Sequence, residues 1–225
     1  MEIKETVILN SQKPLSIGKF ELKSKEYCQY LYLPIFFQES PWDMYVEPRL
    51  NFLSDMVYAA VLDFKQTYGN EFLIGNYLYL TVKQTFIAKD THHNRPGFHS
   101  DGFETEDVQY IFFDKFPTEF LIGEYEVPVD DELSMKAFDE YARIAARDGN
   151  TEAFYQPEPY HLYRIDRHNI HRTTPAFSDG VRTFVKITFS KHRYAQEGNS
   201  YNYSAPDYDW DLKPRSVDRN QPHAK

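Results

Sequence analysis

Three side chains with metal-binding chemistry and one arginine stand out along this chain. His99 and Asp101 are separated by a single residue, His171 lies far downstream, and Arg182 follows at a short distance. Two imidazoles and one carboxylate can hold an iron(II) ion on one face and leave its other face open. The pattern therefore indicates oxygen-activating chemistry, with the arginine as a fixed cation beside it.

The spacing of His99 and Asp101 allows both side chains to bind the same ion. In an extended strand, residues i and i+2 point to the same side, so His99 and Asp101 can reach one ion while Ser100 points away. His171 has to come from another strand or its end. The segment 160–172 is strand-like and ends at a Thr-Thr-Pro turn, so it offers that second strand.

Arg182 lies inside the segment 181–189, VRTFVKITF, whose alternation predicts a strand. Burying an arginine on a strand is costly unless it has an anionic partner. A carboxylate held by both arms of the guanidinium would be such a partner. Lys186 shares the same face of the strand and is the alternative residue for that role.

These residues resemble the HxD…H…R pattern of the 2-oxoglutarate- and iron(II)-dependent dioxygenases. The local sequences that carry the resemblance are RPGFHSDGF around the first ligand pair and HRTTPAFSDGVRTFVKITFS from the second histidine. In that family a proline-containing turn, a glycine and the arginine follow the last ligand, and Pro175, Gly180 and Arg182 keep this order. The resemblance covers roughly residues 76–190.

The resemblance implies a mainly β fold, a double-stranded β-helix (a cupin-like jelly roll) with flanking α-helices. It implies that His99, Asp101 and His171 bind Fe(II) as the catalytic metal, and that Arg182 binds the far carboxylate of the co-substrate 2-oxoglutarate. The implied reaction couples oxidative decarboxylation of 2-oxoglutarate by O2 to C–H oxidation of a small substrate, most simply a hydroxylation. Halogenation is not expected, because halogenating relatives lack the carboxylate ligand that Asp101 supplies here.

One position departs from the resembled pattern. Several relatives carry a Ser or Thr two residues after the arginine, as a second contact to the co-substrate, and here that position is Phe184. Tyr79 and Thr85, on the strand that precedes the HxD pair, are candidates for the missing hydroxyl. An ordinary strand role for each of them, and the absence of such a contact, stay open.

Other histidines compete for the site. His168 and His161 could each replace His171 as the third ligand, but only His171 is followed by the turn and the arginine at the resembled spacing. His92 and His93 precede a proline in the polar stretch KDTHHNR. We expect both in a surface loop, with contact to the substrate as the alternative.

Composition and periodicity independently predict a β-rich fold. The 225 residues include 18 Tyr and 18 Phe, residue types that favour strands. Several short strands joined by turns indicate a β-sandwich or barrel, with a helix packed outside it. The predicted strands are 76–83, 108–113, 119–127, 160–167 and 181–189, and the predicted helices are 50–68 and 131–148.

The pattern shows no domain boundary before about residue 195. We therefore expect residues 1–195 to form a single domain, which the resemblance implies is a double-stranded β-helix oxygenase domain. Residues 196–225 have few aliphatic side chains and many turn formers, so we expect a tail that is either mobile or docked. Its aromatic residues favour docking, as a lid or at a subunit contact, and are Tyr201, Tyr203, Tyr208 and Trp210.

The charge is unevenly distributed. The net charge of −9 argues against nucleic acid as a partner, because a nucleic-acid coat needs a basic surface. Residues 99–140 carry 13 acids and 2 bases, whereas residues 161–194 carry 7 bases and 2 acids. The basic segment suits a small anionic substrate, and salt bridges between the two segments are the alternative.

Three arginines lie near the last ligand in sequence: Arg164, Arg167 and Arg172. They could hold a phosphate or carboxylate of the substrate. Pairing with the acidic run 104–114 is the alternative.

The expected compartment is the cytoplasm. The single cysteine, Cys28, cannot form a disulfide within the chain or build a multi-cysteine zinc site. No secretory signal and no apolar run of about 20 residues is visible, so no membrane partner is expected. The sequence leaves the oligomeric state open.

Two other functions compete with the oxygenase. A zinc-dependent hydrolase could use the same His/Asp/His set with a bound water, and Arg182 would then bind an anionic substrate. A non-catalytic jelly-roll binding protein would use the histidines as ordinary core or surface residues. The metal that binds, and whether 2-oxoglutarate binds, separate the three.

Overall fold

A computed structural model describes residues 5–22, 26–38, 43–70, 74–101 and 105–215. The last ten residues of the predicted tail lie outside this part of the chain. No helix within it is long and apolar enough to cross a lipid bilayer.

The described chain is mainly β, as the sequence predicts, with two α-helices and two short 3-10 helices. The strands are β1 (Thr6–Ser11), β2 (Leu15–Lys19), β3 (Gln29–Phe36), β4 (Tyr77–Ile87), β5 (Val108–Phe113), β6 (Thr118–Leu121), β7 (Gly123–Pro128), β8 (Phe154–Tyr155), β9 (His161–Ile165), β10 (His171–Thr173) and β11 (Gly180–Ser190). The helices are η1 (Pro48–Leu53), α1 (Ser54–Tyr68), α3 (Asp131–Arg147) and η2 (Thr151–Ala153).

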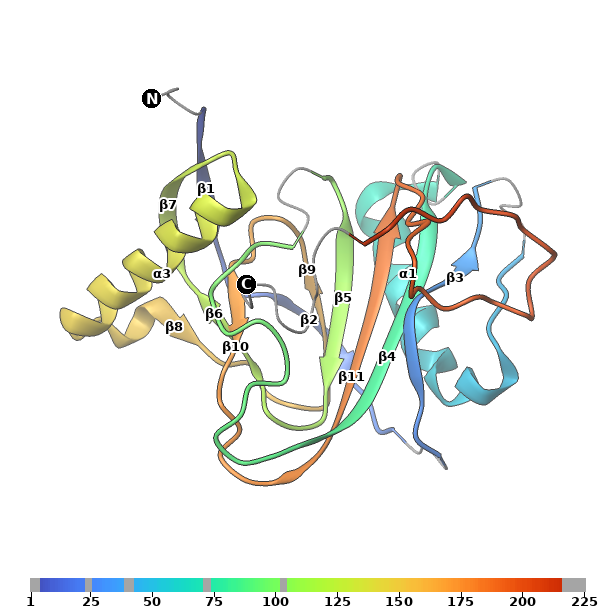
Figure 1. Cartoon of the computed structure of the whole chain (residues 1–225), viewed down its shortest axis with the longest axis horizontal. Coiled ribbons are helices and arrows are strands. Elements are labelled where there is room, and N and C mark those ends of the chain that lie inside the picture. Colours follow the sequence, from blue (N-terminus) through green and yellow to red (C-terminus); the bar gives the residue numbers. More distant parts are fainter. Residues whose placement is uncertain (1–4, 23–25, 39–42, 71–73, 102–104, 216–225) are drawn as a thin grey trace.

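The strands form three antiparallel sheets (Figure 1). A six-stranded sheet has the order β2-β9-β5-β11-β4-β3, and a three-stranded sheet has the order β10-β6-β8. Strands β1 and β7 form a separate pair. The two larger sheets pack through apolar side chains as in a β-sandwich, and the described strands do not close into a barrel.

The six-stranded sheet buries side chains on both faces, because a different layer covers each. The odd-numbered residues of β11, such as Val185 and Phe189, face α1. Helix α1 presents Ala60 and Phe64 at helical spacing to this face, and the Phe64 ring stacks on Phe189 at 4.0 Å between centroids. The even-numbered residues, including Phe184, turn to the three-stranded sheet.

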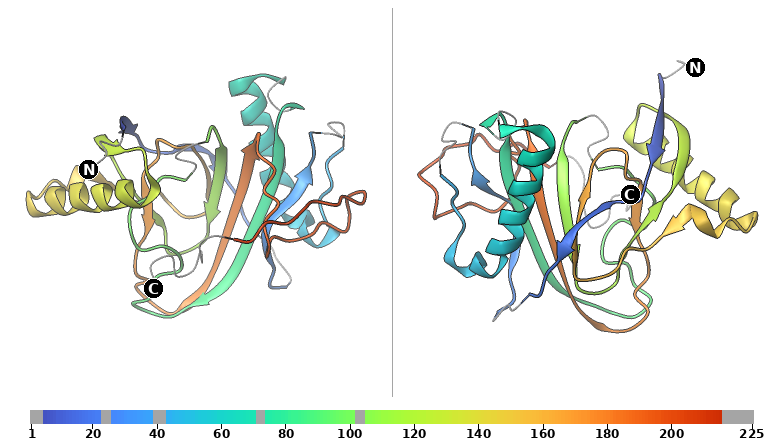
Figure 2. Two further views of the ribbon diagram at one scale, coloured as in Figure 1. Left: turned by 45° about the horizontal axis from the view of Figure 1, so that its top comes forward. Right: turned by 180° about the vertical axis from the view of Figure 1, so that it is seen from behind.

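Side chains alternate along β6, so one face of the three-stranded sheet packs on the six-stranded sheet and the other face packs on α3. Phe120 packs between the two sheets, whereas its neighbour Leu121 packs on the outer side with α3. Asp130 caps α3 by accepting a hydrogen bond from the backbone N–H of Leu133 at 2.9 Å. The two helices therefore cover opposite outer faces of the sheets (Figure 2).

The prediction of one strand over 119–127 is wrong. The chain breaks at Gly123, so that β6 pairs with β10 while β7 pairs with β1. Gly123 has a φ of 149°, and a Cβ atom there would lie 2.7 Å from the hydroxyl oxygen of Tyr125. Only glycine fits such a position without strain, and the change of sheet frees β6 to support β10.

The described part of the tail is docked against β3. Leu31 and Ser200 exchange hydrogen bonds, and the side-chain amide of Asn202 donates to the carbonyls of Pro34 and Tyr45. The rings of Tyr208 and Trp210 pack against Phe37. The tail runs alongside the outer edge of the six-stranded sheet (Figure 1).

The Phe64–Phe189 stack should contribute strongly to stability. Replacing Phe64 by Ala leaves a cavity between α1 and the sheet, and we expect the free energy of unfolding to fall by about 3–5 kcal/mol. The control is Tyr58→Ala on the same helix, whose side chain is 68% exposed and whose loss should cost less than about 1 kcal/mol. Denaturant titration measures both; equal losses would contradict the assigned core.

Candidate metal centre and pocket

Backbone pairing brings the two predicted histidine ligands together. His99 and His171 form an isolated antiparallel bridge in which the N–H of each donates to the carbonyl of the other, both at 2.9 Å. The side chains of such a pair project from the same face, and the ring centroids lie 4.6 Å apart. His171 thus belongs to β10, a strand separate from β9.

Each imidazole is oriented by its own backbone. Nδ1 of His99 lies 2.9 Å from the carbonyl oxygen of Gly97, and Nδ1 of His171 lies 2.8 Å from that of Asn169. A carbonyl oxygen only accepts, so both Nδ1 atoms carry the proton. In the neutral form of each ring the lone pair is then on Nε2, which is how histidine ligands are prepared for a metal.

Asp101 completes the set, although it lies in a turn and not in the expected regular strand. Its Oδ1 is 3.9 Å from Nε2 of His99, and one ligand atom from each of the three residues lies within 4.8 Å of the others. The three side chains are thus close enough to hold one metal ion. Two neutral imidazoles and one carboxylate are donors that suit iron(II).

Lys186 holds the second oxygen of this carboxylate. Its Nζ donates to Oδ2 of Asp101 at 3.0 Å and to the hydroxyl of Tyr32 at 3.3 Å. Burial by itself would raise the pKa of Asp101, but Lys186 and the nearby imidazoles outweigh burial and hold that pKa well below its usual value. Burial, with a smaller contribution from His171, lowers the pKa of His99 to about 3. At neutral pH both groups are in the form that binds a metal.

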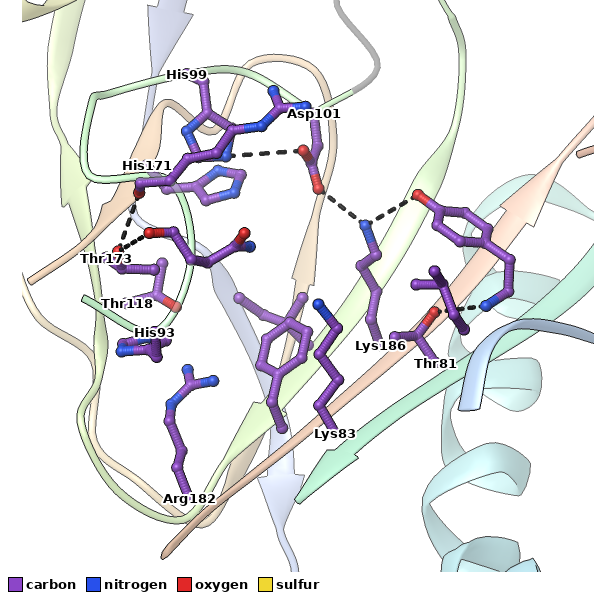
Figure 3. A pocket seen from close by; sticks show the side chains of 16 residues that line it. Thr81, Lys83, His93, His99, Asp101, Thr118, His171, Thr173, Arg182 and Lys186 are labelled. Carbon is purple, nitrogen blue, oxygen red and sulfur yellow. Dashed lines mark hydrogen bonds and ion pairs between the residues drawn. The ribbon is translucent and has the colours of Figure 1, made fainter. Parts of the chain in front are cut away.

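The three candidate ligands open into a pocket between the two sheets (Figure 3). The six-stranded sheet forms one wall and the three-stranded sheet, with the loop that leads to His99, forms the other. The lining residues are Leu31, Tyr32, Thr81, Lys83, His93, Asn94, Arg95, His99, Asp101, Ile111, Thr118, His171, Thr173, Arg182, Phe184 and Lys186. Four of them are Lys or Arg and one is Asp, so the lining of the pocket carries a net positive charge.

Arg182 lines the same pocket, at the end opposite the candidate metal ligands (Figure 3). Its Nε donates to the carbonyl oxygens of Lys115 and Phe116 at 3.0 and 3.1 Å, which leaves the terminal nitrogens for a ligand. Burial lowers the pKa of Arg182 to about 9, against the opposing effect of Asp114. Within the described part of the chain, no carboxylate forms an ion pair with this guanidinium, which stacks on Phe184 at 4.9 Å.

The two candidate hydroxyl residues lie on the pocket face of β4 but outside the pocket lining. Tyr79 donates to the carbonyl of His192 and sits in an aromatic cluster under the tail, while Thr85 is exposed near the end of the strand. The residues that line the pocket from β4 are Thr81 and Lys83, which lie between them on the same face. The alternation of side chains along a strand predicts which residues share the pocket face. It does not predict which of them lie at the pocket.

The structure separates the rival histidines from the triad. His161 bonds to the carbonyl of Pro159 through Nδ1, and His168 borders a different surface hollow, so neither lines the pocket. His93 does line it, in contrast to the expected surface loop, and both of its ring nitrogens are buried. The sequence did not predict the burial of His93, because the polar, turn-rich stretch around it has no hydrophobic periodicity.

The predicted arginine cluster does not form at the pocket. Arg164 pairs with Asp63 on α1 at 2.8 Å, and Arg172 pairs with Glu119 on β6 at 2.6 Å. The partners of these two arginines lie outside the acidic run 104–114 that the sequence offered as the alternative. Arg167 instead borders the same surface hollow as Glu106 and Asp107 of that run, and it adds to the effect of Lys191 in lowering the pKa of Glu106. The ion pairs of Arg164 and Arg172 join β9 to α1 and β10 to β6.

Comparison with known proteins gives little further information. No family model matches this chain, and no curated protein matches it. Among solved structures, the chain is similar to that described as "Crystal Structure of EvdMO1", with a TM-score of 0.39 and 14% sequence identity. The match covers 75% of this chain and 39% of that chain, so this chain spans about two fifths of its length. Similarity at this level carries no argument about function.

The triad should bind one divalent metal ion. Losing a partner of a ligand already costs about 10–100-fold in affinity, so we expect His171→Ala to weaken Mn(II) binding by more than about a hundredfold. The matched control is His161→Ala, which removes an imidazole outside the pocket and should leave the dissociation constant unchanged. Calorimetric titration measures both; equal affinity of the His171 variant and the unmodified protein would show that the triad is not the site.

Proposed function

We propose that this protein is an iron(II)- and 2-oxoglutarate-dependent oxygenase, most simply a hydroxylase of a small anionic substrate. One observation carries the proposal. The His99/Asp101/His171 set and the Arg182 guanidinium lie at opposite ends of one pocket between two antiparallel sheets (Figure 3). A 2-oxo dicarboxylic acid has a metal-chelating end and a far carboxylate, which match these two ends.

The fit to iron rests on the donors themselves. The Nδ1 contacts of both histidines leave Nε2 as the ligand atom of each neutral ring, and Asp101 is held as a carboxylate by Lys186. Three protein ligands leave coordination positions for a bidentate acid and for O2. When bound, iron(II) supplies the activation of O2, with 2-oxoglutarate as the electron source that is converted to succinate and CO2.

The residues of the chain position the reactants and exclude water. The carbonyls of Lys115 and Phe116 fix Arg182 through Nε, so the remaining guanidinium N–H groups can bind a carboxylate from one direction. Phe184 and Ile111 add apolar surface to the pocket lining, and Phe184 lies between Arg182 and Lys186 along β11. The low polarity of this surface strengthens the charge interactions made there.

The finer fold assignment is part of the same proposal. Two facing antiparallel sheets, with His171 on the smaller sheet, His99 bridged to it and Arg182 on the larger sheet, support a double-stranded β-helix. The outer helices α1 and α3 correspond to the expected flanking helices. The proposed partners are the small anionic substrate and O2.

The proposed metal and co-substrate predict a visible absorption band. Adding iron(II) and 2-oxoglutarate to the purified protein without oxygen should produce the weak metal-to-ligand charge-transfer band of a chelated 2-oxo acid. Asp101→Ala should abolish the band, because one of the three protein ligands is lost. A folded, iron-loaded protein without the band would refute the proposal, and activity restored by zinc but not by iron would favour a hydrolase that uses the same triad.

Arg182 should set the affinity for the co-substrate. Arg182→Met keeps much of the side-chain volume but removes the charge-assisted hydrogen bonds, so we expect the dissociation constant of 2-oxoglutarate to rise at least about tenfold. Arg143→Met, on the exposed face of α3, is the control and should bind as the unmodified protein does. Anaerobic titration and succinate formation measure the effect. If the Arg182 variant binds 2-oxoglutarate with unchanged affinity, Arg182 does not bind the far carboxylate.

A further inference from the structure

The imidazole of His93 is a polar group without a hydrogen-bond partner among the described residues. Both ring nitrogens are buried, and neither forms a hydrogen bond to any described part of the chain. A buried donor without a partner lowers the stability of the fold, and native proteins keep few such groups. Since His93 lines the pocket, a ligand there can supply the missing hydrogen bond.

The surroundings of this imidazole are positively charged. Burial lowers the pKa of His93 to about 3, and Arg182, His92 and Lys83 act in the same direction. The ring is therefore neutral at physiological pH, with one N–H to donate. A neutral donor beside a guanidinium suits an anion, because the arginine supplies the charge and the imidazole a directed hydrogen bond.

The loop that carries His93 is held in place on both sides. The N–H of Asp90 donates to the carbonyl of Ala176, and the N–H of Ala176 donates to that of Thr91, at 2.8 and 3.0 Å. The next ring, His92, bonds to the carbonyl of Thr173 through Nδ1 at 3.0 Å. His93 is thus fixed on the pocket wall, between the candidate metal ligands and Arg182 (Figure 3).

We propose that His93 is the second contact to the far carboxylate of the acid that Arg182 binds. This inference rests on the proposed function and deepens it. The position two residues after Arg182 holds Phe184, which has no hydrogen-bonding group, and the ring lies under the guanidinium at 4.9 Å. His93, from the opposite wall, supplies the polar contact and makes the pocket selective for a dicarboxylic 2-oxo acid over a monocarboxylic one of equal length.

Two acids of equal length test this assignment. 2-Oxoglutarate and 2-oxopentanoate share the metal-chelating end, and only the first has a far carboxylate. We would titrate both, without oxygen, into the Mn(II)-loaded protein and measure dissociation constants by calorimetry. His93→Leu should weaken 2-oxoglutarate at least about tenfold and change 2-oxopentanoate less than about threefold. His93→Gln, which keeps a donor, should recover most of the loss.

An imidazole outside the pocket provides the control. His161→Leu removes a ring that bonds to the backbone carbonyl of Pro159 and does not line the pocket, so binding of both acids should stay within about threefold of the unmodified protein. In the Zn(II)-loaded protein, the ring nitrogen resonances of His93 should shift with 2-oxoglutarate and not with 2-oxopentanoate. This measurement needs no folded variant.

The outcomes separate the two proposals. If the unmodified protein binds 2-oxoglutarate but His93→Leu binds it equally well, or loses both acids alike, the role of His93 is refuted and the proposed function stands. Unchanged ring resonances with bound 2-oxoglutarate refute it in the same way. If the unmodified metal-loaded protein binds neither acid, the proposed function fails and the inference fails with it.

Discussion

The candidate site depends on one pair of backbone hydrogen bonds, those exchanged by His99 and His171. An antiparallel pair of this kind directs both side chains to one face, so two residues far apart in the chain present their Nε2 atoms to the same space. Strand β6 secures the other edge of β10, where His171 is the partner of Phe120. Because the backbone makes this pair, the two imidazoles are prepositioned without help from a metal.

The second constraint is the cost of placing two cations on a central strand. Arg182 and Lys186 project from the pocket face of β11, and each has polar partners there: two carbonyl oxygens for the arginine and Asp101 for the lysine. The opposite face of the same strand packs on α1 through residues such as Ile187. The burial of a large apolar core on one side of the strand therefore offsets the desolvation of the two charges on its other side.

Much of this arrangement follows from local patterns. The run VQYIFF at 108–113 predicts β5 with its observed bounds, and the periodicity of 131–148 predicts α3 to within one residue. The parity of β11 places Arg182 and Lys186 on one face. By contrast, the interpretation of 119–127 as one strand missed the change of sheet at Gly123, because a positive φ leaves no mark on hydrophobic periodicity.

The sequence alone determined which residue types could hold a metal and an acid, because the i, i+2 spacing of His99 and Asp101 and the alternation around Arg182 are local properties of an extended chain. Only the tertiary structure decided which other side chains join them. The local sequence predicts that His93 is exposed. In the structure it lines the pocket, because backbone hydrogen bonds join its loop to the segment around Ala176. Lys186 pairs with Asp101 across two elements. Such contacts depend on how the two sheets face each other, and that is set by the packing of the whole core.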